Sequence, residues 1–312
     1  MFALLRTAVS LDSFLLLYCV LSMIVETVWR SLRPAHVAQQ SVATILFGLR
    51  IFPLVASLIV TFALVLPSFQ LMEPLPIHAG MGAVPLALGV CALLLIACGF
   101  VRAIAAQSRT TRAVTCWLEG AHPLKVDADS ADTFQSRPES PPLIVVGVRH
   151  PRVLVSESTV ALLSPDELRM ALKHETEHMK SHDNLKRLIL AFCPFPGMAK
   201  LESAWSQAAE LAADDAAVSS PRDALDLAAA LVKLSRLLPV KAPPVFSAGF
   251  VAGSISERVA RLLDWDEASM SRRVHIRTWF VIPFAVAVSL LVSVAHRPVL
   301  AITHELTEWL VR

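Results

Sequence analysis

The sequence is poor in charged residues and lacks any segment typical of nucleic-acid binding. Charged residues make up 17% of the 312 residues, hydrophobic residues make up 55%, and the mean hydropathy is +0.58. A soluble globular chain carries about 25% charged residues, so we expect this chain to need lipid as well as a protein core. No basic run with interleaved aromatic residues occurs, and the net charge is only +2. We therefore predict no nucleic-acid partner.

Cysteine and tyrosine are also scarce. The five cysteines are scattered and form no CxxC pair, which excludes a disulfide framework and a cysteine-based metal site and fits a cytosolic domain. The single tyrosine, Tyr18, lies in the first long apolar segment. A tyrosine is therefore not available to a site elsewhere in the chain.

Four long apolar segments account for the high hydropathy. They cover residues 9–28, 42–66, 84–105 and 279–295. About twenty apolar residues are enough for a helix to cross a bilayer, and the shorter fourth segment becomes adequate when flanking residues reach the interface. The first segment has no basic leader and no small-residue cleavage site, so we expect an uncleaved span. The sequence predicts a mainly α membrane protein with about four transmembrane helices.

Arginines flank these segments unevenly and predict their orientation. They lie between the first two segments, after the third and before the fourth, at Arg30, Arg33, Arg102, Arg109, Arg112, Arg272, Arg273 and Arg277. The loop of residues 68–82 has no lysine or arginine. Because basic loops stay in the cytoplasm, we expect the N-terminus outside and a cytosolic domain between the third and fourth spans. The predicted parts are a membrane region (1–106), a cytosolic domain (107–276), and the fourth span with a short tail (277–312).

Three charged residues interrupt the first two apolar segments: Asp12, Glu26 and Arg50. Charges of this kind are costly against lipid, so they should face the bundle interior or the interface. A pairing of Glu26 with Arg50 is one hypothesis. Without an inverted repeat or a broken-helix pair, a structural role is favoured over transport.

The motif His174-Glu175-x-x-His178 is the main indication of chemistry. On a helix it places two imidazoles on one face, about 6 Å apart along the axis, so both can reach one metal ion. Zinc suits neutral histidine nitrogens, and three protein ligands leave its fourth position for water. Glu175 would lie beside the metal and act as general base toward that water. We therefore predict one Zn²⁺ per chain, with His174 and His178 as ligands and Glu175 as the catalytic residue.

The start of a helix precedes this motif. Ser164 is a suitable N-cap, Pro165 suits the first helical position, and Glu167 completes a capping box. The spacing predicts a helix over residues 165–180.

The third metal ligand decides the class of site. A metzincin would need a glycine and a third histidine after the second histidine, and the sequence has neither at that spacing. Glu210 is the favoured ligand, with Asp214 on the same helical face as a hydrogen-bond partner of a ligand histidine. His182 remains the alternative. Three ligands in a row on one straight helix would, however, splay away from a tetrahedral ion.

These motifs together resemble a family. His174-Glu175-x-x-His178, His182-Asp183-Asn184-Leu185 and Glu210-x-x-Ala213-Asp214 look like the gluzincin core of the BlaR/MecR-type integral membrane zinc metallopeptidases and their HtpX and CAAX-protease relatives. The resemblance implies a multi-pass protein of the bacterial inner membrane, with an α+β metalloprotease domain in the cytosol. It also implies regulatory proteolysis, with a separate sensor or repressor protein as a partner.

Two features depart from the pattern of that family. Glu177 stands where relatives carry a small or apolar residue, and an extra carboxylate there could bind the metal or disturb the general base. The β-lactam sensors of the family carry a penicillin-binding domain after the fourth span. Here only residues 296–312 follow, without an SxxK signature, so we expect no such sensor domain.

The remaining elements follow from composition and periodicity. Short β-branched runs at 143–148 and 152–156 predict a small sheet, with one strand available to hold an extended substrate or only to cover the zinc helix. The polar stretch 127–142 is typical of a mobile loop. Further helices are expected over residues 183–192, 198–218, 220–238 and 254–263.

The predicted function is a membrane-embedded zinc endopeptidase that cleaves a cytosolic or membrane-proximal protein. An HtpX-like quality-control protease is one alternative. A proteolytically silent, zinc-containing membrane scaffold or signalling subunit is the other. Because the single tyrosine lies in the first apolar segment, the group that stabilises the developing oxyanion must be a histidine, an arginine or a backbone amide. The sequence does not indicate which of these it is.

Overall fold

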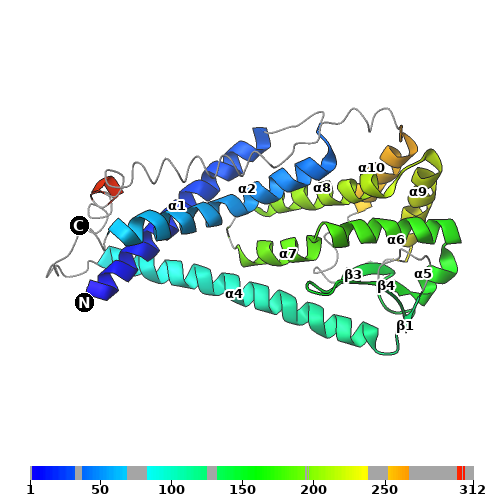
Figure 1. Cartoon of the computed structure of the whole chain (residues 1–312), viewed down its shortest axis with the longest axis horizontal. Helices are drawn as coiled ribbons and strands as arrows, with labels where there is room; N and C mark the ends of the chain where they lie inside the picture. Colours follow the sequence, from blue (N-terminus) through cyan, green and yellow to red (C-terminus); the bar gives the residue numbers. More distant parts are fainter. Residues whose placement is uncertain are drawn as a thin grey trace.

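The computed structural model describes residues 2–31, 37–68, 83–124, 132–193, 195, 197–237, 252–266, 301–303 and 305. This part of the chain is mostly helical, with one small sheet (Figure 1). The predicted fourth span, residues 279–295, and the arginines before it lie outside the described residues. The division of the chain at residues 106 and 276 stays a prediction.

Three helices are long and apolar enough to cross a membrane, which confirms three of the predicted spans. They are α1 (Phe2–Val28), α2 (Gln39–Val60), which continues through the π-helical turn η2 (Thr61–Val65), and α4 (Ala83–Leu118). The 3₁₀ turn η1 (Trp29–Ser31) follows α1. Helix α4 is longer than the predicted segment, because it runs on through a polar stretch toward the sheet (Figure 1).

The sheet has four strands in the order β1-β2-β4-β3. They are β1 (His122–Pro123), β2 (Thr133–Ser136), β3 (Leu143–Val146) and β4 (Arg152–Ser156). The predicted pair β3 and β4 is antiparallel, with Ile144 opposite Leu154. Gly147 follows β3 with φ +91°, and an added Cβ there would meet a backbone oxygen at 2.7 Å, so the turn requires glycine.

Strand β2 corrects the expectation of a mobile loop over residues 127–142. Residues 133–136 pair in parallel with β4, with Thr133 opposite Val153. The polar side chains that favoured a loop are compatible with this strand. Thr133 and Ser136 are buried, and the Ser136 and Ser140 hydroxyls lie at a hydrogen-bonding distance of 2.6 Å. Pairing with a distant strand outweighs the local composition.

Six further helices follow the sheet in the described part of the chain; α5 was not predicted, and the other five agree well with the predicted segments. They are α5 (Glu157–Leu162), α6 (Pro165–Lys180), α7 (Asp183–Phe192), α8 (Ala199–Ala217), α9 (Pro221–Ser235) and α10 (Ala252–Leu263). One apolar cluster places α6 between the sheet and α9, through residues such as Val153, Leu172 and Leu234. A second joins α6, α9 and α10 through Met170 and Leu262. Helix α6 is therefore fixed from two sides.

Helix α8 packs directly against the membrane helix α2 (Figure 1). Trp205 of α8 is buried in this contact together with Ala43 and Leu190. Arg50 of α2 is 1% exposed and lies 2.9 Å from Glu202 of α8. It also donates to the carbonyl oxygen of Cys193.

The proposed pairing of Arg50 with Glu26 is therefore wrong. Glu26 instead binds Arg30, one helical turn further along the chain, and accepts a hydrogen bond from Trp29 at 3.1 Å. Glu26 has a partner one helical turn away, whereas the Arg50 side chain is enclosed in the α2–α8 contact, where it donates to the Glu202 carboxylate.

Candidate metal centre

The start of α6 sets the position of the two motif histidines. The Ser164 side chain accepts a hydrogen bond from the Glu167 backbone at 3.3 Å, and the Glu167 carboxylate accepts one from the Ser164 backbone at 2.8 Å. Pro165 occupies the first helical turn, so the predicted capping box is confirmed. Lys233 of α9 donates to the same carboxylate at 2.7 Å. Burial favours the neutral form of Glu167, but the bonds from Lys233 and Ser164 outweigh it and lower the pKa of the carboxyl group.

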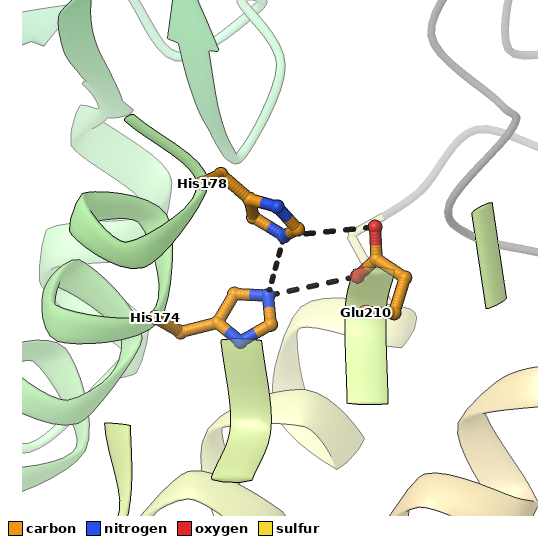
Figure 2. Close-up of side chains that lie close together, drawn as sticks. All are labelled: His174, His178 and Glu210. Atoms are coloured by element: carbon orange, nitrogen blue, oxygen red, sulfur yellow. Dashed lines mark hydrogen bonds and ion pairs between the residues drawn. The ribbon is translucent and has the colours of Figure 1, made fainter. Parts of the chain in front are cut away.

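Three predicted metal ligands converge in the structure (Figure 2). The Nε2 atoms of His174 and His178 lie 3.2 Å apart. Glu210 of α8 faces both of them, with Oε2 3.6 Å from His174 Nε2 and Oε1 3.7 Å from His178 Nε2. All three ligand atoms lie within 4.8 Å of one another. Glu210, which lies 32 positions beyond His178 in the sequence, thus joins the two motif histidines in one compact cluster.

The spacing of these atoms fits a tetrahedral zinc ion. Bond lengths of about 2.0–2.1 Å at tetrahedral angles separate neighbouring ligand atoms by roughly 3.3–3.4 Å. The two imidazole nitrogens, 3.2 Å apart, lie close to this value, and Glu210 presents a different carboxylate oxygen to each of them, at 3.6 and 3.7 Å. Two imidazoles and one carboxylate are a common zinc ligand set with room for a water. His174, His178 and Glu210 can therefore hold zinc with little rearrangement.

The Nδ1 atom of each ligand histidine faces a carboxylate. His178 Nδ1 lies 2.7 Å from Asp183 Oδ2, and His174 Nδ1 lies 3.0 Å from Asp214 Oδ1. A proton held on Nδ1 by such a partner leaves the lone pair of Nε2 free for a metal. Asp214 lies where the sequence placed it, but the role of Asp183 was missed. It follows the left-handed turn at His182, φ 55°, which brings the start of α7 back to the end of α6.

Arg258 of α10 is a second residue that the sequence did not indicate. It is fully buried and donates to both oxygens of Asp214 at 2.7 Å. It also donates to Glu210 Oε2 at 2.9 Å. Burial favours the neutral form of Asp214, but Arg258 and His174 outweigh it and lower the pKa of this carboxyl group to about 2. No local pattern could indicate Arg258, because it lies 44 residues beyond Asp214.

Negative charge dominates around the two imidazoles. Burial disfavours a charged His178, but the Glu210 charge and the hydrogen bond to Asp183 outweigh it and raise the pKa of this imidazole to about 10. Burial likewise favours a neutral Glu210, yet the facing histidines and Arg258 hold the pKa of its carboxyl group well below the usual range. The cluster therefore favours a bound cation, as a divalent metal site must.

The other acidic and histidine candidates take different positions. Glu175 is partly exposed and makes no hydrogen bond to another described residue, yet its charge acts on both His178 and Arg258. Glu177 pairs with Lys180 at 2.7 Å and is not part of the cluster. His182 is exposed at the start of α7. The structure thus brings Glu210, and not His182, together with the two motif histidines.

Comparison with known families connects this cluster to a class of enzymes. The sequence matches the family described as BlaR1 peptidase M56 over residues 81–262, more than half of the chain. No curated protein matches the chain. The matched segment runs from the start of α4 almost to the end of α10, so His174, His178 and Glu210 fall inside it together with Asp183 and Asp214, the carboxylates that face the two histidines. The resemblance to BlaR/MecR-type peptidases is thereby confirmed at the level of the family: the chain belongs to the BlaR1 peptidase M56 family of membrane-associated metallopeptidases.

Proposed function

We propose that this protein is a membrane-embedded zinc endopeptidase of the gluzincin type. The observation that carries the proposal is the buried cluster of His174, His178 and Glu210, whose candidate ligand atoms lie within 4.8 Å of one another and form a ligand set that zinc commonly takes. Membership of a peptidase family supports a hydrolytic rather than a structural use of the metal.

Each residue of the site has a role in this proposal. His174, His178 and Glu210 would hold the ion, and Asp183 and Asp214 would fix the histidine tautomers. A bound zinc ion would supply Lewis acidity toward the scissile carbonyl and make its water a stronger acid.

Glu175 acts on the water as general base in the same scheme. It accepts a proton from the water and passes it to the departing amine. Its partial exposure and lack of a hydrogen-bonding partner among the described residues leave its carboxylate available for this work.

The substrate class follows from the placement of the domain. The basic loops support a cytosolic position of the cluster, and the family supports a bacterial inner membrane, so the proposed substrate is a cytosolic or membrane-proximal protein. The direct contact of α2 with α8 supports a regulatory use, because α8 also carries Glu210. A separate sensor or repressor protein would then act as the partner.

The experiment compares variants purified in detergent for zinc content and for cleavage of casein. Wild type should hold one zinc and cleave, Glu175→Gln should keep zinc but lose about 10²–10⁴-fold in rate, and Glu210→Ala should lose zinc. Glu177→Gln is the matched control, because it removes a neighbouring carboxylate that Lys180 binds outside the cluster. Zinc bound in every variant with no cleavage by any of them would overturn the proposal in favour of a silent scaffold.

A further inference from the structure

A peptidase of this kind needs a group that stabilises the negative charge developing on the scissile carbonyl oxygen. Tyr18 is not that group, because it packs among Phe14 and Phe195 in the membrane part of the fold. Among the described residues, the cationic side chains that reach the ligand carboxylate of Glu210, other than the two ligand histidines, are Arg258 and Arg187.

The donors of Arg258 are already in use. Its Nε and Nη2 atoms bind the two oxygens of Asp214, its Nη1 atom binds Glu210, and its side chain is 2% exposed. A substrate oxygen could recruit this guanidinium only by breaking bonds to buried carboxylates, which is costly. Arg258 therefore holds the site together rather than serving the substrate.

Arg187 differs from Arg258 in each of these respects. It lies four residues after Asp183 on α7, so it shares the helical face whose carboxylate binds His178. Its Nη2 atom lies 3.7 Å from Glu210 Oε1, which is too long for a hydrogen bond. Its side chain is 36% exposed, and its buried Nε atom has no hydrogen-bond partner in the described part of the chain. The guanidinium thus lies at the edge of the cluster and has N–H donors available to a substrate.

We propose that Arg187 is a catalytic residue, which donates hydrogen bonds to the scissile carbonyl oxygen in the transition state. The inference rests on the proposed peptidase function. When the water oxygen bonds to the carbonyl carbon, the π electron pair of the carbonyl moves onto its oxygen. When the carbon–nitrogen bond breaks, that pair restores the carbonyl, and the amine leaves with the proton supplied through Glu175. Arg187 keeps its own protons throughout.

Guanidinium chemistry suits this task. Arginine stays charged at any working pH and offers five donors. Its hydrogen bonds to an anionic oxygen are stronger than those to a neutral one, so the contact favours the transition state over the bound substrate. A residue that only neutralised Glu210 would instead affect the metal, and Arg258 already contacts that carboxylate at 2.9 Å.

The test uses the full-length protein in detergent, with Arg187→Gln, Arg187→Lys and wild type. The matched control is Arg222→Gln, which removes an equal charge from an 80% exposed arginine on α9 that pairs with Asp166. Three quantities are measured: kcat and KM on a quenched casein peptide, the Kd for zinc, and the affinity for a phosphonamidate peptide whose tetrahedral anion imitates the intermediate.

We expect Arg187→Gln to lower kcat by about 10²–10³-fold and to weaken the phosphonamidate by a similar factor. KM and the Kd for zinc should hardly change, and Arg187→Lys should recover part of the rate. Unchanged kcat in an Arg187→Gln variant of an active enzyme would overturn this inference alone, as would a loss of zinc that accounts for the whole defect. A wild type that neither binds zinc nor cleaves would overturn the proposed function together with it.

Discussion

Removal of the carboxylate behind His178 should weaken zinc binding without unfolding the protein. Asp183 lies 2.7 Å from His178 Nδ1 and is buried, so Asp183→Ala leaves the imidazole free to rotate and to change tautomer. Loss of such a partner costs 10–100-fold in metal affinity, which corresponds to about 1.4–2.7 kcal/mol. Asp183→Asn keeps an acceptor oxygen without the charge and should lose less. Competition with a chromophoric zinc chelator at fixed pH measures the affinity.

Asp183 also has a second role that the experiment must separate. It is the acidic residue in the first turn of α7, where a negative charge contributes about 0.3–1 kcal/mol to helix stability. Asp223 is likewise an acidic residue in the first turn of its helix, α9; it accepts a hydrogen bond from Ser219 at 2.7 Å and lies outside the cluster. Asp223→Ala should therefore lower the melting temperature and leave the zinc affinity as in wild type. A zinc Kd of Asp183→Ala within twofold of wild type, or an equal loss in Asp223→Ala, would refute the reasoning.

Three further predictions concern stability. The pKa of the Glu167 carboxyl group is lowered in the fold, so its charge stabilises the protein fully above the ordinary glutamate pKa of about 4.3, and this contribution is lost as the pH falls through the lowered pKa. Glu167→Gln should therefore melt below wild type at pH 7, and the difference in melting temperature should shrink as the pH is lowered into the acid range. Gly147→Ala should cost about 1–3 kcal/mol from backbone strain alone, because φ is +91° there; equal melting temperatures of variant and wild type would contradict this. Arg50→Met and Glu202→Gln should show a coupling of about 0.5–3 kcal/mol in a double-mutant cycle in detergent, whereas additive effects would mean that the buried contact at 2.9 Å contributes nothing specific.

Much of the fold and part of the site could be predicted from sequence because they depend on local patterns. The capping box at Ser164 and the run of helical spacing after it place α6 within a residue of its observed bounds. Two histidines four residues apart on that helix necessarily share a face. Long apolar runs with few charges indicated the three described membrane helices for a comparable reason, since hydropathy is a local property. Glu210 was found from its Asp214 neighbour one helical turn away and from resemblance to a family.

Contacts between side chains that are far apart in the sequence could be identified only from the tertiary structure. Residues 133–136 are polar and form strand β2 because they pair with β4. Arg50 pairs with Glu202 rather than with Glu26, which is closer to it in the sequence. Arg258 lies 84 residues from His174 and Arg187 lies 23 from Glu210, yet both guanidinium groups reach the cluster. Neither separation corresponds to a helical or strand period, so no pattern along the chain indicates these contacts. Local patterns in the sequence therefore predict most of the helices and the metal-binding motif. The packing of α7, α8 and α10 around α6 determines which charged residues surround that motif, because a buried charge takes its partner from the element that packs against it.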